Sequence, residues 1–494
     1  MTYFLTMPTP RSSSPLNRGR NVIMMVSDGF GPASQTYGRS FWQYQNNYTS
    51  DHITSLDEIL VGSSRTRSSN SLVTDSAAGA TAFSCALKSY NAAIGVDPNG
   101  VPCGTVLEAA KKADMLTGLV VTSRVTHATP AAFSAHVAHR DMEEIIATQQ
   151  IGDYELGRQV DLMLGGGRCF FLPNTTEGSC RTDSRDLIRE AQTHHGWKHV
   201  LFSGTEFESL VKARDGAVPL PLMGLFNSDH MNFEIDRRNT QSDEPSLNRM
   251  AKVALESLKA NSREKGRGFF LMIEGSRIDM GAHNNDPVAH IHEILEYHRT
   301  IQVVKDFVAQ NEDTIMISTS DHETGGFTLG LQVDPKIYPE YLWRPEVIER
   351  AKLSTEILTM KLMAFHANEP KVKSAHSQER RRRVEHYVST EILERGLGIK
   401  DPSMDEIESL ADPTVRSADV MRFLSRAISR RASLGWTTMG HTGVDVNLYA
   451  KGSPDIGKYT MDKLRGNHEN TDIGNFMSWF LDLNLKDVTD RLAK

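Results

Sequence analysis

The chain has 494 residues, with 62 acidic and 55 basic side chains and a formal net charge of -7. This length provides for a large hydrophobic core or for more than one folding unit. Hydrophobic residues make up 39% and charged residues 24%, as in an ordinary soluble globular protein. The acidity gives no indication of a nucleic-acid partner, and apolar runs such as Val22–Val26 are too short to span a membrane. Composition therefore argues against a nucleic-acid-binding or membrane-spanning chain.

The N-terminal segment carries one short apolar group, Tyr3-Phe4-Leu5, followed by prolines and serines. That group is too short for the apolar core of a secretory signal peptide. We therefore expect residues 1–20 to form a flexible lead-in, without a signal peptide or transmembrane helix, ahead of a folded domain at residues 21–485.

Four short apolar runs each lead to a polar side chain. They are Val22–Val26 before Asp28, Leu119–Val121 before Thr126-His127, Phe269–Ile273 before Glu274, and Ile315–Ile317 before Asp321-His322. Such runs predict buried strands. Helical patterns at Thr105–Ala113 and Pro287–Gln310 separate them. Alternating strands and helices predict an α/β fold with a mostly parallel sheet, which gathers ligands at the carboxyl ends of its strands.

The stretch from about Pro335 to Gly435 has a different composition, rich in charge and in helix-forming residues. Its centre is the run Arg380–Arg383. A charge run of this kind usually forms the solvated face of a helix. We expect this stretch to form helices packed on the sheet and an insertion near the functional site.

The cysteines contain no Cys-x-x-Cys pair, which argues against a cysteine zinc site. They are Cys85, Cys103, Cys169 and Cys180. Cys169 and Cys180 flank a short loop, and their spacing leaves a disulfide open, provided that the compartment is oxidising. Two glycosylation sequons, at Asn47 and Asn174, are weak signals because such triplets arise often by chance.

Candidate metal ligands follow the predicted strands. Asp279 and His283 are one helical turn apart, so both can face one cation. Asp321 and His322 can reach a metal together because the glycines after them permit a turn. His441 is a third histidine between small residues. Each residue alone could be an ordinary cap or hydrogen-bonding group, but the joint pattern of Asp and His suits zinc, and carboxylate with hydroxyl oxygens suits magnesium.

A candidate nucleophile, Ser76, precedes a run of alanine and glycine. Such a run lets a helix begin close to other backbone, and Ser76 would then lie at a helix N-terminus, where a phosphate is favoured. The alternative is that Asp75 or Ser76 only caps this helix, and a cap can also be a nucleophile. The segment is not a Gly-x-Ser-x-Gly elbow, which argues against a serine esterase.

Together these motifs resemble the alkaline phosphatase family. The matching segments, in the family's order, are Asp28-Gly29, Thr74–Ala80, His127–Pro130, Glu274-Gly275 with Asp279 and His283, Asp321-His322, and His441–Gly443. The match runs from Asn21 to about Phe476, and the residues of its motifs are most similar to the fungal vacuolar (repressible) branch. The resemblance implies a three-layer α/β/α sandwich with a smaller crown-like insertion within about residues 335–435. It also implies metal-dependent hydrolysis of phosphate monoesters through a phosphoserine, with a broad substrate range and an alkaline pH optimum.

The resemblance further implies a role for each matching position. Ser76 is the expected nucleophile, Arg140 the phosphate-binding arginine, and Asp75 the residue that positions it. Two zinc ions and one magnesium ion per subunit are implied. The implied ligands are Asp279, His283 and His441 for one zinc, Asp28, Asp321 and His322 for the other, and Asp28, Thr129 and Glu274 for the magnesium. His127 is expected beside the third metal or the phosphate. A histidine at this position resembles the animal enzymes, and Met280 stands where other branches have a Lys or His. The resemblance therefore leaves the identity of the third metal open.

Other properties follow from the resemblance alone. It implies a homodimer, a glycoprotein, and a location in the vacuole lumen or membrane or in the secretory pathway. The implied substrates are small phosphate esters and could include phosphoproteins. Nucleic acid is not an expected partner.

Rival hypotheses differ in the residues they require. A sulfatase needs a Cys/Ser-x-Pro-x-Arg context, which is absent around Ser76. A phosphodiesterase or a phosphoglycerate mutase remains a related alternative, but a phosphodiesterase need not keep Thr129, Glu274 and Arg140. A catalytically dead scaffold would have lost the nucleophile or a ligand, and each is present in this sequence.

Overall fold

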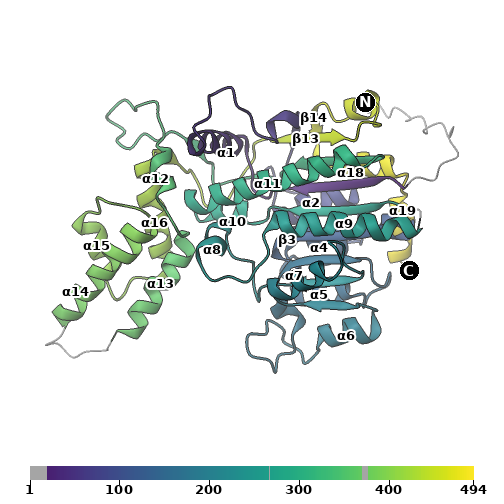
Figure 1. The fold of residues 1–494 in the computed structure, drawn as a ribbon, viewed down its shortest axis with the longest axis horizontal. Coiled ribbons are helices and arrows are strands. Elements are labelled where there is room, and N and C mark those ends of the chain that lie inside the picture. The colour runs from purple at the N-terminus through teal and green to yellow at the C-terminus, as the bar shows by residue number, and fades with distance from the viewer. Residues whose placement is uncertain (1–18, 266, 370–376, 494) are drawn as a thin grey trace.

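The centre of the molecule is a ten-stranded sheet with the order β14-β2-β13-β8-β1-β7-β3-β4-β6-β5 (Figure 1). The computed structural model describes residues 19–265, 267–369 and 377–493. The predicted flexible lead-in, residues 1–20, thus lies almost wholly outside the described residues. The strands are β1 Asn21–Val26, β2 Leu60–Arg65, β3 Leu116–Arg124, β4 Leu162–Gly166, β5 His199–Leu201, β6 Leu222–Leu225, β7 Phe269–Glu274, β8 Thr314–Thr319, β13 Val446–Gly452 and β14 Gly466–Glu469.

The sheet is mostly parallel, as the alternation of strands and helices predicts. Strand β1 pairs in parallel with both β7 and β8, and β3 pairs in parallel with β7 and β4. The exception is β13, which runs antiparallel to both β8 and β2. The four predicted apolar runs lie in β1, β3, β7 and β8. The prediction of an α/β fold with a mostly parallel sheet is therefore confirmed.

Helices cover both faces of the sheet. Successive side chains of each strand point to opposite faces, and because the central strands are apolar on both, each face needs a covering layer. In β1, Ile23 and Met25 belong to one hydrophobic core, whereas Val22, Met24 and Val26 belong to the other. The helices on the first face are α1 Pro32–Gln45, α7 Gly204–Lys212, α8 Glu234–Asn239, α9 Leu247–Lys265, α10 Arg277–His283 and α11 Pro287–Gln310. Those on the second are α2 Ser76–Cys85, α3 Val106–Lys112, α4 Ala128–Ser134, α5 Glu143–Ile151, α6 Leu187–His194 and α18 Asn470–Leu481, with α19 Leu485–Leu492 packed on α3.

Local signals at the ends of α3 and α11 explain why the sequence predicts these helices well. Thr105 and Glu108 form a capping box at the start of α3. Asp286 caps α11, which begins with Pro287, a residue already suited to the first helical position. Both helices end within one residue of the predicted bounds.

A group of helices extends from one end of the sheet, on the left in Figure 1. It consists of α12 Pro345–Glu349, α13 Thr355–Asn368, α14 Ser377–Tyr387, a π-helical continuation Val388–Gly396, α15 Met404–Ala411 and α16 Ser417–Ala432. The arginine run lies on α14, where Arg381 and Arg383 form ion pairs with Glu385 and Glu369 and keep 57% and 44% of their side-chain surface exposed. This is the solvated face that a charge run predicts.

Two disulfides close loops on the second face. Cys169 is bonded to Cys180, which resolves the pairing that spacing left open. Cys85 is bonded to Cys103, a pairing that the sequence analysis did not predict. Among the described residues, no helix is both long enough and apolar enough to cross a bilayer.

Buried carboxylates anchor the N-terminus of α13 to the rest of the protein. Asp236 of α8 accepts a hydrogen bond from the Ser354 amide at 2.9 Å, and Asp286 accepts from the Thr355 amide at 2.7 Å. The second oxygen of Asp236 is buried without a hydrogen-bond partner. Burial raises the pKa of Asp236 from 3.8 to about 7, because the ionised form loses its hydration.

We expect the substitution Asp236→Asn to weaken the pH dependence of stability. The native carboxyl keeps its proton up to about pH 7 and the unfolded one loses it near pH 3.8, so wild-type stability falls as pH rises through this window. Asparagine is neutral at every pH, like the protonated acid. The substitution should therefore remove about 2–4 kcal/mol of the free energy of unfolding that the wild type loses as pH rises. Urea unfolding at pH 5 and pH 8 measures the difference. An equal pH dependence in both proteins would contradict this role of Asp236.

Candidate active site

The predicted site residues come from the carboxyl edge of the central strands. Asp28 follows β1 by two residues, Glu274 ends β7, and Asp321 follows β8 by two residues. The register aligns Val26 at the end of β1 with both Glu274 and Thr319. Parallel pairing therefore brings three distant carboxylates to one edge of the sheet.

His441 reaches the same edge by a different route. It precedes β13, and since β13 is antiparallel to β8, the start of β13 lies where the parallel strands end. His441–Thr442 form strand β12, which pairs with β9, Glu323–Thr324, directly after His322. The ring of His441 stacks on that of His322 with centroids 3.5 Å apart.

Ser76 is the first residue of α2 and is buried in the site. Asp75 caps the helix by accepting a hydrogen bond from the Ala78 amide at 3.0 Å. The Ser76 hydroxyl lies 3.1 Å from His322 Nε2 and 3.5 Å from Asp28 Oδ1. A Cβ at Gly79 would lie 2.9 Å from Asp321 Cβ, so the missing side chain lets α2 approach the strand ends.

Arg140 is held between Asp75 and His127. One guanidinium nitrogen lies 3.1 Å from Asp75 Oδ2, and the other donates to His127 Nε2 at 3.0 Å. Asp75 thus both caps the helix of Ser76 and holds the arginine. The guanidinium keeps further N–H groups for an anion.

A first group of metal donors consists of Asp279, His283 and His441. His283 Nδ1 donates to the Met439 carbonyl at 2.5 Å, and His441 Nδ1 donates to the Thr74 carbonyl at 2.8 Å. Their Nε2 atoms lie 3.1 Å apart, and His283 Nε2 lies 3.2 Å from Asp279 Oδ2. Two imidazole nitrogens this close to each other and to a carboxylate suit a cation between them.

A second group consists of Asp28, Asp321 and His322, whose ligand atoms lie within 4.8 Å of one another. The same criterion also groups His322 with Asp279 and His441, so His322 lies between the two sets of donors. Thr324 donates to Asp279 Oδ1 at 2.6 Å and accepts from His322 Nδ1 at 3.2 Å. This contact leaves the lone pair of His322 on Nε2, facing the other ligands.

A third group consists of buried oxygens without hydrogen-bond partners. They are Asp28 Oδ2, Thr129 Oγ1 and Glu274 Oε1. The other oxygen of Glu274 accepts from Ser276 at 2.7 Å and from Ser123 at 3.4 Å. Buried polar atoms are rarely unpaired, so three orphaned oxygens here suit a hard cation such as magnesium.

The electrostatics of the site also require positive charge. Burial and the nearby charges of Asp321 and Asp279 raise the pKa of Asp28 well above its ordinary value. Burial likewise raises the pKa of Glu274 to about 7. Although burial alone would lower it, the Asp279 carboxylate raises the pKa of His283 to about 9. Several carboxylates buried this closely are costly unless cations compensate them.

Several residues of the site escaped the sequence analysis. Thr324 and Ser276 follow predicted ligands by two residues, so proximity to a motif was a usable signal. Asn91, which accepts from the Asp75 amide at 3.2 Å, carries no motif. His230, edge-on to His127 at 5.2 Å and contacting Arg124, also had no signal because it follows β6 far along the chain.

Comparisons with known proteins show the family of the chain. The family model described as alkaline phosphatase matches residues 19–483. The chain is 49% identical over 491 residues to the repressible alkaline phosphatase of Saccharomyces cerevisiae, covering 97% of this chain and 84% of the yeast protein. It is 46% identical over 486 residues to the alkaline phosphatase of Schizosaccharomyces pombe, covering 97% and 85%.

Solved structures of alkaline phosphatases share the fold. The alkaline phosphatase of Thermus thermophilus matches with a TM-score of 0.75 and 27% identity, covering 94% of this chain and 92% of that chain. A cold-active alkaline phosphatase from a psychrophilic Shewanella matches with a TM-score of 0.73 and 30% identity, covering 93% and 99%. The conserved fold and the identity over nearly the whole chain establish that this chain belongs to the alkaline phosphatase family and is a phosphate monoester hydrolase.

Proposed function

We propose that this chain hydrolyses phosphate monoesters through a phosphoserine at Ser76. The observation that carries this proposal is the Ser76 hydroxyl, buried at a helix N-terminus and 3.1 Å from His322 Nε2 inside the cluster of cation donors. In the first half-reaction, Ser76 Oγ bonds to phosphorus, loses its proton, and the alcohol departs. In the second, a water cleaves the phosphoserine and releases inorganic phosphate.

Arg140 and the start of α2 bind the phosphate in this mechanism. The guanidinium can donate two parallel hydrogen bonds to two phosphate oxygens, a geometry that a lysine ammonium cannot copy. The free amides at the start of α2 favour the same negative charge. Asp75 keeps the guanidinium in place through the 3.1 Å ion pair.

Two zinc ions and one magnesium ion are the cofactors that fit the donors. The nitrogen-rich set of Asp279, His283 and His441 suits zinc, as does the set of Asp28, Asp321 and His322. When bound, the ions supply Lewis-acid charge that stabilises the attacking and leaving oxygens of an in-line displacement. The chain's residues orient these donors through the carbonyls and hydroxyls described above.

His127 favours magnesium at the third site. Because Arg140 donates to Nε2, and because burial and Arg140 lower the pKa of His127 well below its ordinary value, the neutral ring carries its proton on Nδ1. His127 then offers a hydrogen-bond donor and no ligand atom. His127 Nδ1 is itself buried without a hydrogen-bond partner, and the oxygens of Asp28, Thr129 and Glu274 suit magnesium.

The remaining assignments rest on the resemblance to the alkaline phosphatase family. We propose a catalytic domain at residues 21–485 with an insertion within about 335–435, a homodimer, a vacuolar or secretory location, glycosylation, a broad substrate range and an alkaline pH optimum. The sequon residues Asn47 and Asn174 are exposed, which is compatible with glycosylation.

The substitution Arg140→Lys tests the phosphate clamp, by which we mean Arg140 and the Asp75 carboxylate that holds it. We expect it to raise both the KM for a phosphate monoester and the inhibition constant for inorganic phosphate by about 10- to 100-fold, the cost of losing a bidentate charged contact. Steady-state kinetics with phosphate as inhibitor measures both constants. Unchanged phosphate inhibition would remove Arg140 from the binding site.

A further inference from the structure

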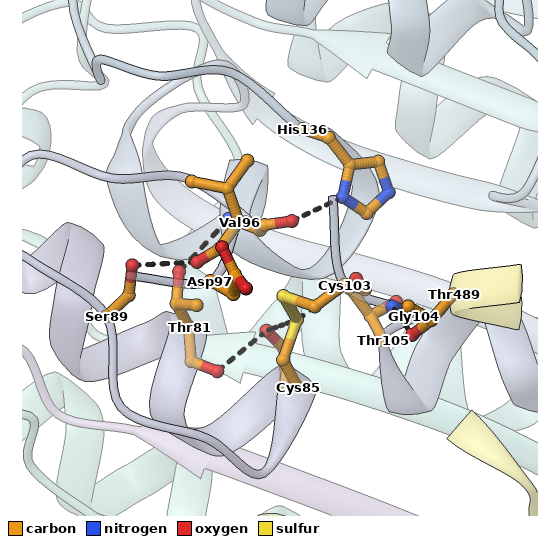
Figure 2. Close-up of a disulfide and its surroundings, with 12 residues drawn as sticks. Thr81, Cys85, Ser89, Val96, Asp97, Cys103, Gly104, Thr105, His136 and Thr489 are labelled. Carbon is orange, nitrogen blue, oxygen red and sulfur yellow. Dashed lines mark hydrogen bonds between the residues drawn. A yellow bond between two sulfur atoms is a disulfide. The ribbon is translucent and has the colours of Figure 1, made fainter. Parts of the chain in front are cut away.

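The loop between α2 and α3, residues 86–104, is closed by a disulfide and lies against the phosphate clamp. Cys85 ends α2, the helix that begins with Ser76, and its bond to Cys103 spans 18 positions of the chain. Figure 2 shows the bond among side chains of α2, of the loop and of the segment around His136. Both cysteines are buried, with 6% and 3% of their surfaces exposed.

The loop is braced on two sides. Toward α2, the Thr81 hydroxyl donates to the Ala93 carbonyl at 3.2 Å and accepts from the Gly95 amide at 3.1 Å. Toward the segment that leads to Arg140, Ile94 pairs with Val137 as an antiparallel bridge. The loop therefore connects the helix of the nucleophile with the segment that carries the arginine.

Two residues of the loop contact the pair Asp75 and Arg140: Ala92 contacts both, and Asn91 contacts Asp75. The Ala92 amide donates to Asp75 Oδ2 at 2.9 Å, and the Ala92 carbonyl accepts from the Arg140 amide at 2.8 Å. The Asn91 side chain accepts from the Asp75 amide at 3.2 Å and donates to the Val73 carbonyl at 3.0 Å. Asp75 Oδ2 is the same atom that pairs with the Arg140 guanidinium.

The backbone at Ala92 is in an unfavourable conformation. Its φ is +76°, in the left-handed region that a residue with a Cβ rarely adopts. Such a conformation persists where surrounding contacts impose it, and it is common beside functional sites. Here Ala92 is held by its contacts with Asp75 and Arg140, inside the loop that the disulfide closes.

We propose that the disulfide-closed loop is a positioning element for phosphate binding, in which Asn91 and Ala92 fix Asp75 and Arg140, so that phosphate affinity depends on the Cys85–Cys103 bond. Asn91 acts through Asp75 and is a positioning residue. The inference rests on the proposed role of Arg140 in binding phosphate, and it assigns a functional consequence to one of the two disulfides.

The second disulfide provides a matched control. Cys169 and Cys180 close a shorter loop after β4, of 11 positions against 18, and the next residue, Arg181, contacts the Glu144 and Phe170 carbonyls at 3.1 Å. Both cysteine pairs can be replaced by alanine in the full chain. Loss of either closure should lower the melting temperature, since it frees a loop in the unfolded chain. Only the first pair should change phosphate affinity.

The experiment measures the inhibition constant of inorganic phosphate, KM, kcat and the melting temperature of the metal-loaded enzyme. We expect Cys85→Ala/Cys103→Ala to raise the inhibition constant and KM about tenfold, the effect of weakening one hydrogen bond to a charged group, with a smaller change in kcat. Cys169→Ala/Cys180→Ala should lower the melting temperature and leave the inhibition constant unchanged. A purely structural role would reduce the active fraction, and hence kcat, without moving the inhibition constant.

A second variant tests the proposal if the first double variant does not fold. Asn91→Ala keeps the disulfide and should also raise the inhibition constant about tenfold, but it should have no further effect in an Arg140→Ala background. An unchanged inhibition constant in Asn91→Ala, with a clear increase in Arg140→Ala, would overturn the inference and leave the proposed function standing. An unchanged inhibition constant for phosphate in Arg140→Ala would instead contradict the proposed role of Arg140 in binding phosphate.

Discussion

Ser76→Ala is expected to lower the turnover of a chromogenic phosphate monoester by at least about 10³-fold and to abolish phosphoserine formation. The reason is geometric: Ser76 Oγ is the hydroxyl that lies both at the N-terminus of α2 and 3.1 Å from His322 Nε2. Rapid acid quenching with a phosphorus-labelled substrate, followed by mass spectrometry of the peptide that contains residue 76, measures the intermediate.

A serine on the same helix is the control for this substitution. Ser84 is buried and donates to the Ala132 carbonyl at 2.6 Å. Ser84→Ala should reduce stability by about 1 kcal/mol and keep both turnover and the phosphoserine. Metal content should be the same in both variants. Full turnover by Ser76→Ala would exclude Ser76 as the nucleophile, and diester turnover that exceeded monoester turnover would favour a phosphodiesterase.

Removal of the metals is expected to inactivate the enzyme and to lower its melting temperature. The physical reason is the charge of the site, where Asp28, Glu274 and Asp321 are fully buried and cations would compensate them. Ligand binding to the native state adds stability that grows with the ratio of ligand concentration to Kd, so zinc with magnesium should restore both properties. Activity after chelation and readdition, with elemental analysis at each stage, measures this dependence.

Glu274→Gln separates the third metal site from the other two. The substitution removes one carboxylate charge from the orphaned oxygens and leaves the histidine donors unchanged. We expect it to weaken reactivation by magnesium while two zinc ions per chain are retained. Full activity after verified removal of all metal would contradict the metal-dependent mechanism.

Local patterns in the sequence determined much of the fold. Pro287–Gln310 could be predicted to the residue because its cap, its first-turn proline and its apolar spacing are all local. The central strands could be predicted from short apolar runs because a strand between two helix layers is buried on both faces. The order of the site motifs along the chain indicated the family, and the comparisons confirmed it.

Long-range pairing decided the direction of β13, the pairing of Cys85 and the contacts among the site residues, because no local pattern encodes which distant segments meet. The antiparallel direction of β13, and with it the way His441 comes to stack on His322, depends on sheet register. The bond between Cys85 and Cys103 depends on how the loop folds back on α2. The contacts of Asn91 with Asp75, and of Thr324 with Asp279, depend on segments brought together only by the tertiary fold. The sequence by itself thus determined the family and indicated the candidate site residues. The tertiary structure decided which side chains hold those residues in place, since hydrogen bonds act over about 3 Å of space and not over separation in the chain.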